Sequence, residues 1–216
     1  MVDLLIRQRD YLLDISRALT SHLSLNDVLL RRSLDAGRTW GPSRAIVRCD
    51  DYGPGPVSNF VMVSDAADGA VHALYCHNYA RVFYMHSTDD GATFAEPVEI
   101  TDTLLSFRAE YPWRVIATGP GHGIQLDRSP YHGRLVVPVW MSDGSGTEFG
   151  PGKLGHRPSS VASIYSDDGG RTWTPAGPFV DQKGQPIQAN NRPWSLIRLA
   201  SGPIALTYET IPAEPG

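Results

Sequence analysis

Short apolar runs separated by turn-forming residues make up most of the chain. They are rich in Val, Ile, Leu and Tyr, and Gly, Pro, Asp and Ser bound them, which is the pattern of short β-strands. The runs lie at 27–33, 43–49, 58–64, 71–76, 81–87, 96–101, 113–118, 133–142, 160–166, 177–180, 194–200 and 203–209. The pattern therefore predicts an all-β fold.

The first twenty residues do not follow this pattern. Leu4, Leu5, Leu12, Ile15 and Leu19 could line one face of a helix, with charged residues elsewhere. Residues 1–22 are therefore interpreted as a possible short amphipathic helix, with altered strand sequence as the alternative.

A motif of the form S-x-D-x-G-x-T-[WF], an Asp box, occurs three times, which is too often for chance. Its Asp and Ser can bond backbone N–H groups of a tight turn, its Gly can adopt a positive φ, and its aromatic residue can anchor the turn to the core. The positions are Ser33, Asp35, Gly37, Thr39 and Trp40; Ser87, Asp89, Gly91, Thr93 and Phe94; and Ser166, Asp168, Gly170, Thr172 and Trp173. The motif predicts structural hairpin turns on an outer rim, with the aspartates away from any pocket.

The spacing of the boxes divides the chain into four-stranded units. Asp35, Asp89 and Asp168 are 54 and 79 residues apart, which suits propeller blades of about 40–50 residues that carry loops. The runs between the first two boxes predict one antiparallel blade, and a Gly-rich insertion at 143–155 lengthens the next. Residues 23–216 would then hold about three blades, an incomplete ring with exposed edges, as expected of a fragment or truncated reading frame.

Composition narrows the classes of partner. The 216 residues are 41% hydrophobic and 19% charged, which suits a folded domain. The net charge of −4, without a run of Lys or Arg, argues against nucleic acid and anionic membranes, and no apolar stretch approaches the roughly 20 residues of a membrane span. Cys49 and Cys76 each fall in a strand-like run and are expected to be buried free thiols.

Metal and cofactor chemistry find no support in the pattern. The seven histidines show no HxxxH or HExxH spacing, and the segment 119–123 (GPGHG) lacks the pattern of a phosphate-binding loop. The acidic pairs at 89–90 and 167–168 lie inside Asp boxes, where the turn already uses one carboxylate. We therefore expect no cofactor.

The segments between the boxes resemble bacterial and animal exo-α-sialidases (neuraminidases) with BNR repeats. The resemblance covers about 23–180, and GPGHGIQL at 119–126 and GRLVVPVW at 133–140 are its most specific parts. It implies a six-bladed β-propeller that removes terminal sialic acid from a sialylated glycan with retention of configuration.

The resemblance also implies a catalytic set that this chain matches poorly. The family uses a tyrosine nucleophile with a glutamate, an aspartate as acid/base, and three arginines around the sialic acid carboxylate. No FRIP-like strand carries the first arginine, His22 stands near the acid/base position, and Asp27 lies where a strand begins. Asn-Arg-Pro at 191–193 replaces the glutamate region, and the remaining groups would follow Gly216. We therefore expect an incomplete, inactive sialidase sequence.

Three residues remain candidates for substrate binding. Asn59 resembles a residue at the pocket mouth, with a turn cap as an equal alternative, and Trp140 falls where aromatic residues shape the sugar pocket, with a core position as the favoured alternative. His122 is a substrate contact or a hydrogen-bonded loop residue. The alternative function is a non-catalytic Asp-box propeller that binds glycan or protein.

Overall fold

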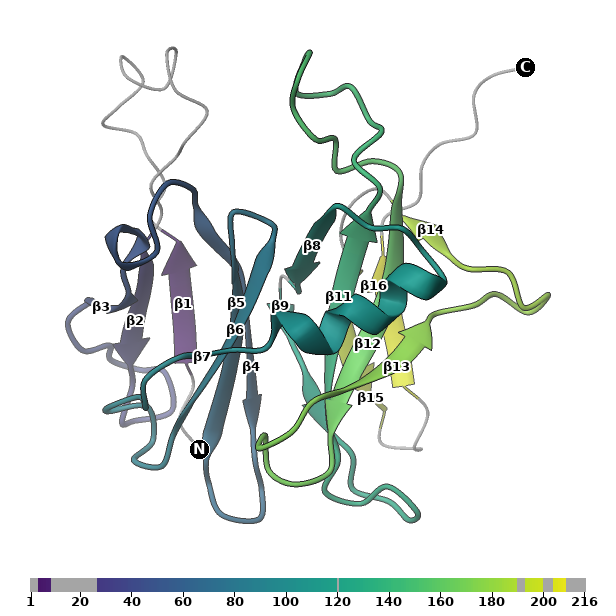
Figure 1. The fold of residues 1–216 in the computed structure, drawn as a ribbon. Helices are drawn as coiled ribbons and strands as arrows, with labels where there is room; N and C mark the ends of the chain where they lie inside the picture. Colours follow the sequence, from purple (N-terminus) through teal and green to yellow (C-terminus); the bar gives the residue numbers. More distant parts are fainter. Residues whose placement is uncertain (1–3, 9–26, 120, 190–192, 200–203, 209–216) are drawn as a thin grey trace.

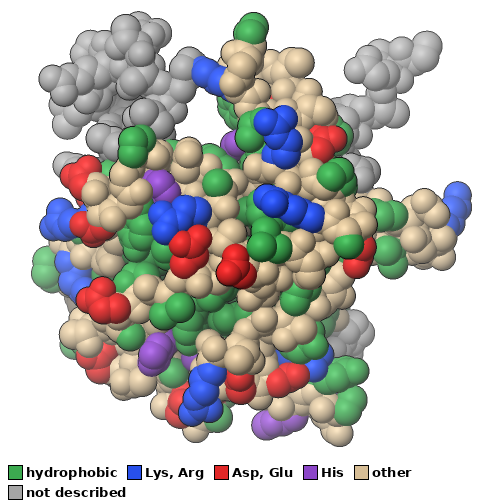
Figure 2. Space-filling model, in the orientation of Figure 1, with side chains coloured by type: hydrophobic (Ala, Val, Ile, Leu, Met, Phe, Trp, Pro, Cys, Tyr) green, Lys and Arg blue, Asp and Glu red, His purple; other side chains and the backbone are tan. Residues whose placement is uncertain are grey.

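The protein is described by a computed structural model that covers residues 4–8, 27–119, 121–189, 193–199 and 204–208. Almost all of its regular structure is β, as the sequence predicts. Within these ranges no helix is long and apolar enough to cross a membrane. On the face shown in Figure 2, acidic and basic side chains are interspersed among polar and apolar ones.

The strands form four sheets that follow one another along the chain (Figure 1). Sheet 1 holds β1 (Leu4–Gln8), β2 (Val28–Arg32) and β3 (Arg44–Val47), and sheet 2 holds β4 (Val57–Ser64), β5 (Val71–His77), β6 (Arg81–Ser87), β7 (Val98–Glu99) and β9 (Gly121–His122). Sheet 3 holds β8 (Val115–Thr118), β10 (Ile124–Gln125), β11 (Leu135–Ser142), β12 (Ser159–Ser166), β13 (Thr174–Pro178) and β14 (Gln188–Ala189), and sheet 4 holds β15 (Pro193–Arg198) and β16 (Ile204–Tyr208). Two 3₁₀ helices, η1 (Cys49–Asp51) and η2 (Thr101–Ala109), lie between strands.

Sheet 2 has the four antiparallel strands that the sequence predicts between the first two boxes. The order is β7-β6-β5-β4, and β9 joins the β4 edge in parallel. All seven residues of β5 are buried, because neighbours cover both faces of the sheet. Leu74 and Cys76 face a core shared with sheet 3, whereas Ala73 and Tyr75 face a core shared with sheet 1. Sheet 2 is thus joined face to face to both sheet 1 and sheet 3.

The glycines at the two ends of the GPGHG segment let two sheets approach closely. A Cβ atom at Gly119 would collide with Val61 Cγ2, and one at Gly123 would lie 2.6 Å from the carbonyl oxygen of Val136. Neither position can therefore carry a side chain without displacing its neighbours. Glycine here permits β9 to leave sheet 3 and pair with β4.

The start of the chain differs from the helical interpretation. Leu4–Gln8 is strand β1, which pairs antiparallel with β2 from Leu4↔Arg32 to Gln8↔Val28. Strand pairing satisfies the backbone groups along that edge of β2, which a helix packed on its side chains would leave open. The strand alternative therefore holds for these five residues, and the rest of 1–22 lies outside the described residues.

Candidate functional site

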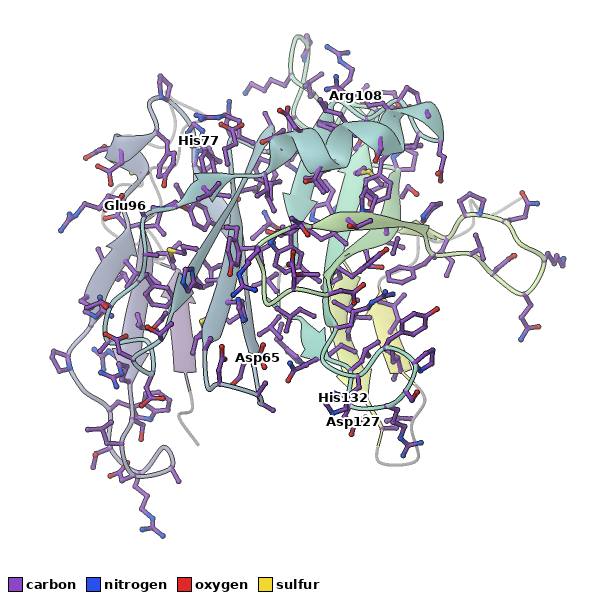
Figure 3. The ribbon with its side chains drawn as sticks, turned by 60° about the horizontal axis from the view of Figure 1, so that its bottom comes forward. Asp65, His77, Glu96, Arg108, Asp127 and His132 are labelled. Carbon is purple, nitrogen blue, oxygen red and sulfur yellow. The ribbon has the colours of Figure 1, made fainter. Side chains whose placement is uncertain are left out.

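The two ends of the sheets carry different kinds of residues. All three boxes lie at one end, the box end, together with the turn after β4 that begins at Asp65. The opposite end, which we call the Asn59 end, is formed by Asn59, Tyr79, Trp140 and His156. Figure 3 shows Asp65 near one end of sheet 2 and His77 near the other.

Each box folds through the same set of short hydrogen bonds. In the third box, Asp168 Oδ1 accepts from the Thr172 N–H at 2.9 Å, and Asp168 Oδ2 accepts from Thr172 Oγ1 at 2.6 Å. Ser166 Oγ accepts from the Gly170 N–H at 2.8 Å and donates to Asp168 Oδ1. The first and second boxes repeat these contacts around Asp35 and Asp89. The aspartates therefore hold turns and face no common cleft.

These bonds hold the box carboxylates ionised. Hydrogen bonds from the side chain and backbone of Thr39 lower the pKa of Asp35 to about 2, and the backbone and side chain of Thr93 lower that of Asp89 to about 2. Such groups are poor proton donors or acceptors near neutral pH. They contribute turn geometry rather than acid–base chemistry.

The aromatic residues of the boxes are packed to different depths. Trp173 is buried between sheets 2 and 3, whereas Phe94 and Trp40 are half-buried. Trp40 lines a pocket of about 440 Å³, and Gly170 lines a second of about 580 Å³. The prediction that the aspartates avoid pockets agrees with both linings, although other box residues contribute to them.

Asn59 lies in a bulge of β4 and connects two sheets. Its φ is 55°, and the register of β4 against β5 shifts between Ser58 and Val61. Its carbonyl accepts from Thr118 Oγ1 of sheet 3 at 2.6 Å, and its Nδ2 donates to Ser58 Oγ at 2.9 Å. Asn tolerates the left-handed conformation better than most residues, and its amide can bond in both directions. Asn59 thus joins β4 of sheet 2 to β8 of sheet 3.

Trp140 belongs to the core beneath this end. It is 2% exposed, and its Nε1 donates to Asn59 Oδ1 over 3.5 Å, at the outer limit for such a bond. Its ring lies 5.9 Å from that of Tyr79 and 5.3 Å from that of His156. Because the indole is covered, it supports the half-buried Tyr79 and His156, which form the surface above it.

His122 is exposed and lies on β9, where it pairs with Met62 of β4. Its partner on β4 is therefore three positions along the strand from Asn59. The structure brings Asn59 and Trp140 into direct contact and puts His122 farther along the same strand edge.

Other residues singled out from the catalytic pattern are structural or lie elsewhere. Asp27 Oδ1 accepts from the Cys49 N–H at 3.0 Å and so fixes the end of sheet 1. His22 and 191–192 lie outside the described residues, and Pro193 begins β15. Cys49 and Cys76 are buried free thiols as predicted, and burial raises the pKa of each to about 11.

The acidic side chains of the loop between β11 and β12 support the loop itself. Asp143 Oδ1 accepts from the Ser145 N–H at 2.8 Å, and Glu148 Oε1 accepts from the His156 N–H. Across the described ranges, no group of three His, Cys, Asp or Glu side chains could hold a metal ion. The described part of the Asn59 end is therefore an aromatic and amide surface suited to contact with an uncharged part of a ligand.

Sequence reasoning missed Tyr79 and His156. Tyr79 follows Asn78 in the tight turn between β5 and β6, and both have positive φ values, 51° for Asn78 and 53° for Tyr79. The segment His-Asn-Tyr-Ala at 77–80 between two apolar runs was a turn signal. Nothing local in the sequence connects that turn to His156, whose ring lies 4.3 Å from that of Tyr79.

Comparisons with known proteins point in one direction. A family described as a BNR repeat-like domain matches residues 19–202. Sialidase-3 of Mus musculus is 31% identical over 170 residues, covering 71% of this chain and 39% of the relative. Sialidase of Micromonospora viridifaciens is 27% identical over 169 residues, covering 68% of this chain and 24% of the relative.

Solved structures show the same fold. A Trypanosoma rangeli sialidase in complex with 2,3-difluorosialic acid superposes with a TM-score of 0.63 at 16% identity, covering 96% of this chain and 32% of that one. The intramolecular trans-sialidase of Ruminococcus gnavus gives a TM-score of 0.60 at 13% identity, covering 87% and 60%. The chain spans less than half the length of the sialidases of Mus musculus and Micromonospora viridifaciens named above.

Proposed function

The chain belongs to the sialidase family with BNR repeats, and from this membership we propose that it is part of a glycoside hydrolase that releases terminal sialic acid from glycans. The family match over most of the chain supports this reading. The substrate would be a sialylated glycan. The finer architecture is part of the same proposal: a six-bladed propeller, of which this chain supplies about three blades.

The Asn59 end would be the substrate side. The observation that carries this proposal is the clamp around Asn59, where Thr118 Oγ1 and Trp140 Nε1 fix one residue from both its carbonyl and its side chain. A rigid, partly apolar wall is what a sugar site needs, because a preformed surface binds without an ordering cost. Tyr79 and His156 would contact the uncharged part of the sugar.

The described residues of this wall would not perform the chemistry. Sialidases employ a tyrosine nucleophile rather than the usual carboxylate. Asp143 and Glu148, the acidic groups of the loop that leads to His156, accept hydrogen bonds from their own loop. We therefore propose that this chain alone binds weakly and does not turn substrate over.

A fluorogenic sialoside tests the inactivity. With the purified chain, we expect release of 4-methylumbelliferone to equal the blank, while an active sialidase assayed in parallel converts the same substrate. Loss of several members of a coupled catalytic set lowers rates by orders of magnitude. Release above the blank that Tyr79→Phe or Asp27→Asn abolishes would contradict this proposal.

The second candidate is a glycan-binding propeller without catalysis, which the engaged carboxylates of the loop favour. Saturation-transfer NMR with sialyllactose and lactose tests whether the chain prefers a sialylated glycan to a neutral one. We expect sialyllactose to give the stronger signal, and His156→Ala to reduce it relative to Phe149→Ala. Equal signals from both sugars, unchanged in His156→Ala, would remove the Asn59 end as the sialoside site.

A further inference from the structure

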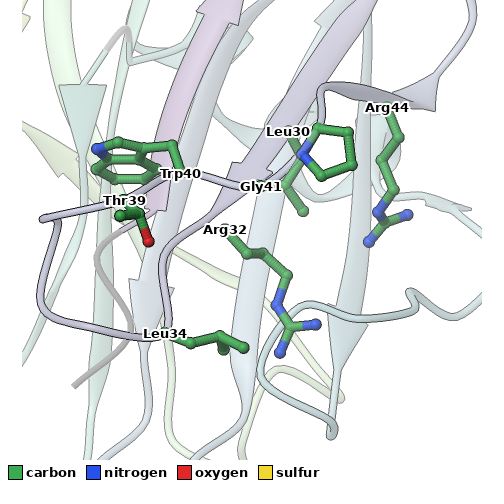
Figure 4. Close-up of a pocket in the computed structure, with 8 residues that line it drawn as sticks. Leu30, Arg32, Leu34, Thr39, Trp40, Gly41 and Arg44 are labelled. Carbon is green, nitrogen blue, oxygen red and sulfur yellow. The ribbon is translucent and has the colours of Figure 1, made fainter.

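A pocket at the box end has the composition of an anion site. It has a volume of about 440 Å³ and is lined by Leu30, Arg32, Leu34, Thr39, Trp40, Gly41, Pro42 and Arg44 (Figure 4). The volume falls within the roughly 300–1,000 Å³ of small-molecule sites. We propose that this pocket binds the carboxylate of an acidic sugar, at a second site separate from the Asn59 end.

The two arginines share one face of sheet 1. Leu30 of β2 lies directly opposite Arg44 of β3, and Arg32 follows Leu30 by two residues. Side chains at i and i+2 of a strand point to the same side, so Arg32 and Arg44 are diagonal neighbours across the strand pair. Figure 4 shows their side chains extending in the same direction.

Neither arginine is neutralised within the described part of the chain. Arg32 Nε is buried and has no hydrogen-bond partner there, and no carboxylate forms an ion pair with either guanidinium. The pocket lining includes no acidic side chain. Two neighbouring like charges and a buried unbonded donor are costly, and one oxyanion between them would relieve both.

Arg44 is already held in position from the next sheet. Its Nη2 donates to the carbonyls of Gly91 at 2.6 Å and Ala92 at 2.7 Å, both in the second box. These bonds fix one edge of the guanidinium and leave its other N–H groups for a ligand. Planar, fixed guanidinium groups bind carboxylates with paired hydrogen bonds. The pocket is therefore preorganised for an anion.

The remaining wall suits the body of a sugar. Trp40 and Pro42 offer apolar surface, and Leu34 is 85% exposed at the rim. A pyranose ring has an apolar C–H face that packs on such surface while its hydroxyl groups remain in water. A free inorganic anion would leave this apolar wall unused. The combination points to a carboxylate on a ring.

The equivalent pocket between sheets 2 and 3 shows that the box fold does not require arginines. There, counting from each box Ser, Tyr84 stands in place of Leu30, His86 in place of Arg32, and Val98 in place of Arg44. That pocket also has Asp68 and Glu96 in its lining. The paired arginines are thus particular to the first pocket.

Glucuronic acid and glucose provide the matched probes, because they differ at the carboxylate. With the full chain in low salt, titration followed by NMR should show glucuronate binding at least about tenfold more tightly than glucose. Binding should weaken as salt is added, because the ions screen the guanidinium groups. Equal affinities, or no glucuronate binding, would overturn the proposal.

Variants then locate the site. Arg32→Gln should weaken glucuronate binding about tenfold, whereas Arg31→Gln, on the adjacent exposed residue, should change it less than about twofold. Leu34→Asp adds a repelling carboxylate at an exposed rim position, so it should weaken binding without disturbing the fold. Thermal melts establish that each variant is folded. Unchanged glucuronate affinity in both Arg32→Gln and Leu34→Asp would place the ligand elsewhere and refute the site.

Discussion

The box end and the Asn59 end use hydrogen bonds in opposite ways. In the boxes, Asp35, Asp89 and Asp168 bond to residues four positions away, on or near the surface. At the other end, Asn59 bonds to Thr118 and Trp140, which are 59 and 81 residues away and buried. One end is built from local repeats, and the other exists only after separate sheets have come together.

This difference predicts where stability resides. When a box unfolds, water replaces each of its exposed hydrogen bonds. A single box residue therefore contributes modestly to the free energy of unfolding. The indole of Trp140 is removed from water by two sheets and a loop, and its loss would leave a cavity. Substitutions at the two ends should therefore differ clearly in how much unfolding free energy they cost.

Trp140→Ala should give the largest effect. The missing indole leaves unfilled volume beneath Tyr79 and His156 and removes the Nε1 donor to Asn59, so we expect about 3–5 kcal/mol of lost unfolding free energy. Urea denaturation followed by far-ultraviolet circular dichroism measures it.

Phe149→Ala is the matched control for this change. Phe149 touches the ring of His156 at 4.7 Å but is 43% exposed, so its removal should cost far less. If the two variants were equally destabilised, the Asn59 end would not owe its stability to the buried indole.

Gly170 and Gly169 separate local from long-range constraint within one box. Both have positive φ values, 81° for Gly170 and 68° for Gly169, so alanine at either costs about 1–2 kcal/mol in backbone strain. A Cβ at Gly169 meets nothing within 4 Å, whereas one at Gly170 would collide with Tyr84 Oη and lie 2.9 Å from His72 Nδ1. We expect Gly170→Ala to cost about 1–3 kcal/mol more than Gly169→Ala in denaturant unfolding. Equal losses of unfolding free energy in the two variants would mean that close packing of Gly170 against sheet 2 does not contribute to stability.

The same glycine shows how far the sequence could be read. The motif alone predicted the turn and the positive φ at Gly170, because those depend on neighbours within eight residues. It could not predict that the glycine also packs against Tyr84 and His72 of the preceding sheet. The strands were predictable for a similar reason, since their alternation and turn residues are local.

The Asn59 end was predicted only in part. Resemblance pointed to Asn59 and Trp140, but the contact between them depends on a bulge in β4 and on the close approach of β8. Tyr79 and His156 carried no shared pattern, and η2, whose Leu104 and Phe107 enter the core, had no amphipathic signal in the sequence. Features that arise from the meeting of distant segments leave little trace in local pattern.

Asn59→Ala and Asn59→Gly test whether this residue combines two tasks. Both remove the side-chain acceptor for Trp140 Nε1, while only alanine also meets the strain of a φ of 55°. We expect Asn59→Gly to cost about 1 kcal/mol and Asn59→Ala about 1 kcal/mol more, measured by thermal and urea unfolding. A glycine variant less stable than the alanine variant would show that backbone strain at Asn59 is unimportant.

Acid titration should give the smallest difference and divide the two ends by mechanism. The pKa values of Asp35 and Asp89 are about 2 in the folded chain, below the ordinary 3.8, because Thr39 and Thr93 donate to the ionised carboxylates. A lowered folded-state pKa means that the unfolded chain takes up protons first, so this contribution is complete above about pH 4 and is lost as the pH falls toward 2. Asp35→Asn combined with Asp89→Asn should flatten the decline of stability with pH across that window, whereas Asn59→Ala, which removes only bonds between uncharged groups, should leave its slope unchanged. Urea midpoints measured between pH 2 and 5 report the slope. The bonds of Asn59 join uncharged groups. If Asn59→Ala changed the slope and the double aspartate variant did not, the pH dependence would not come from Asp35 and Asp89.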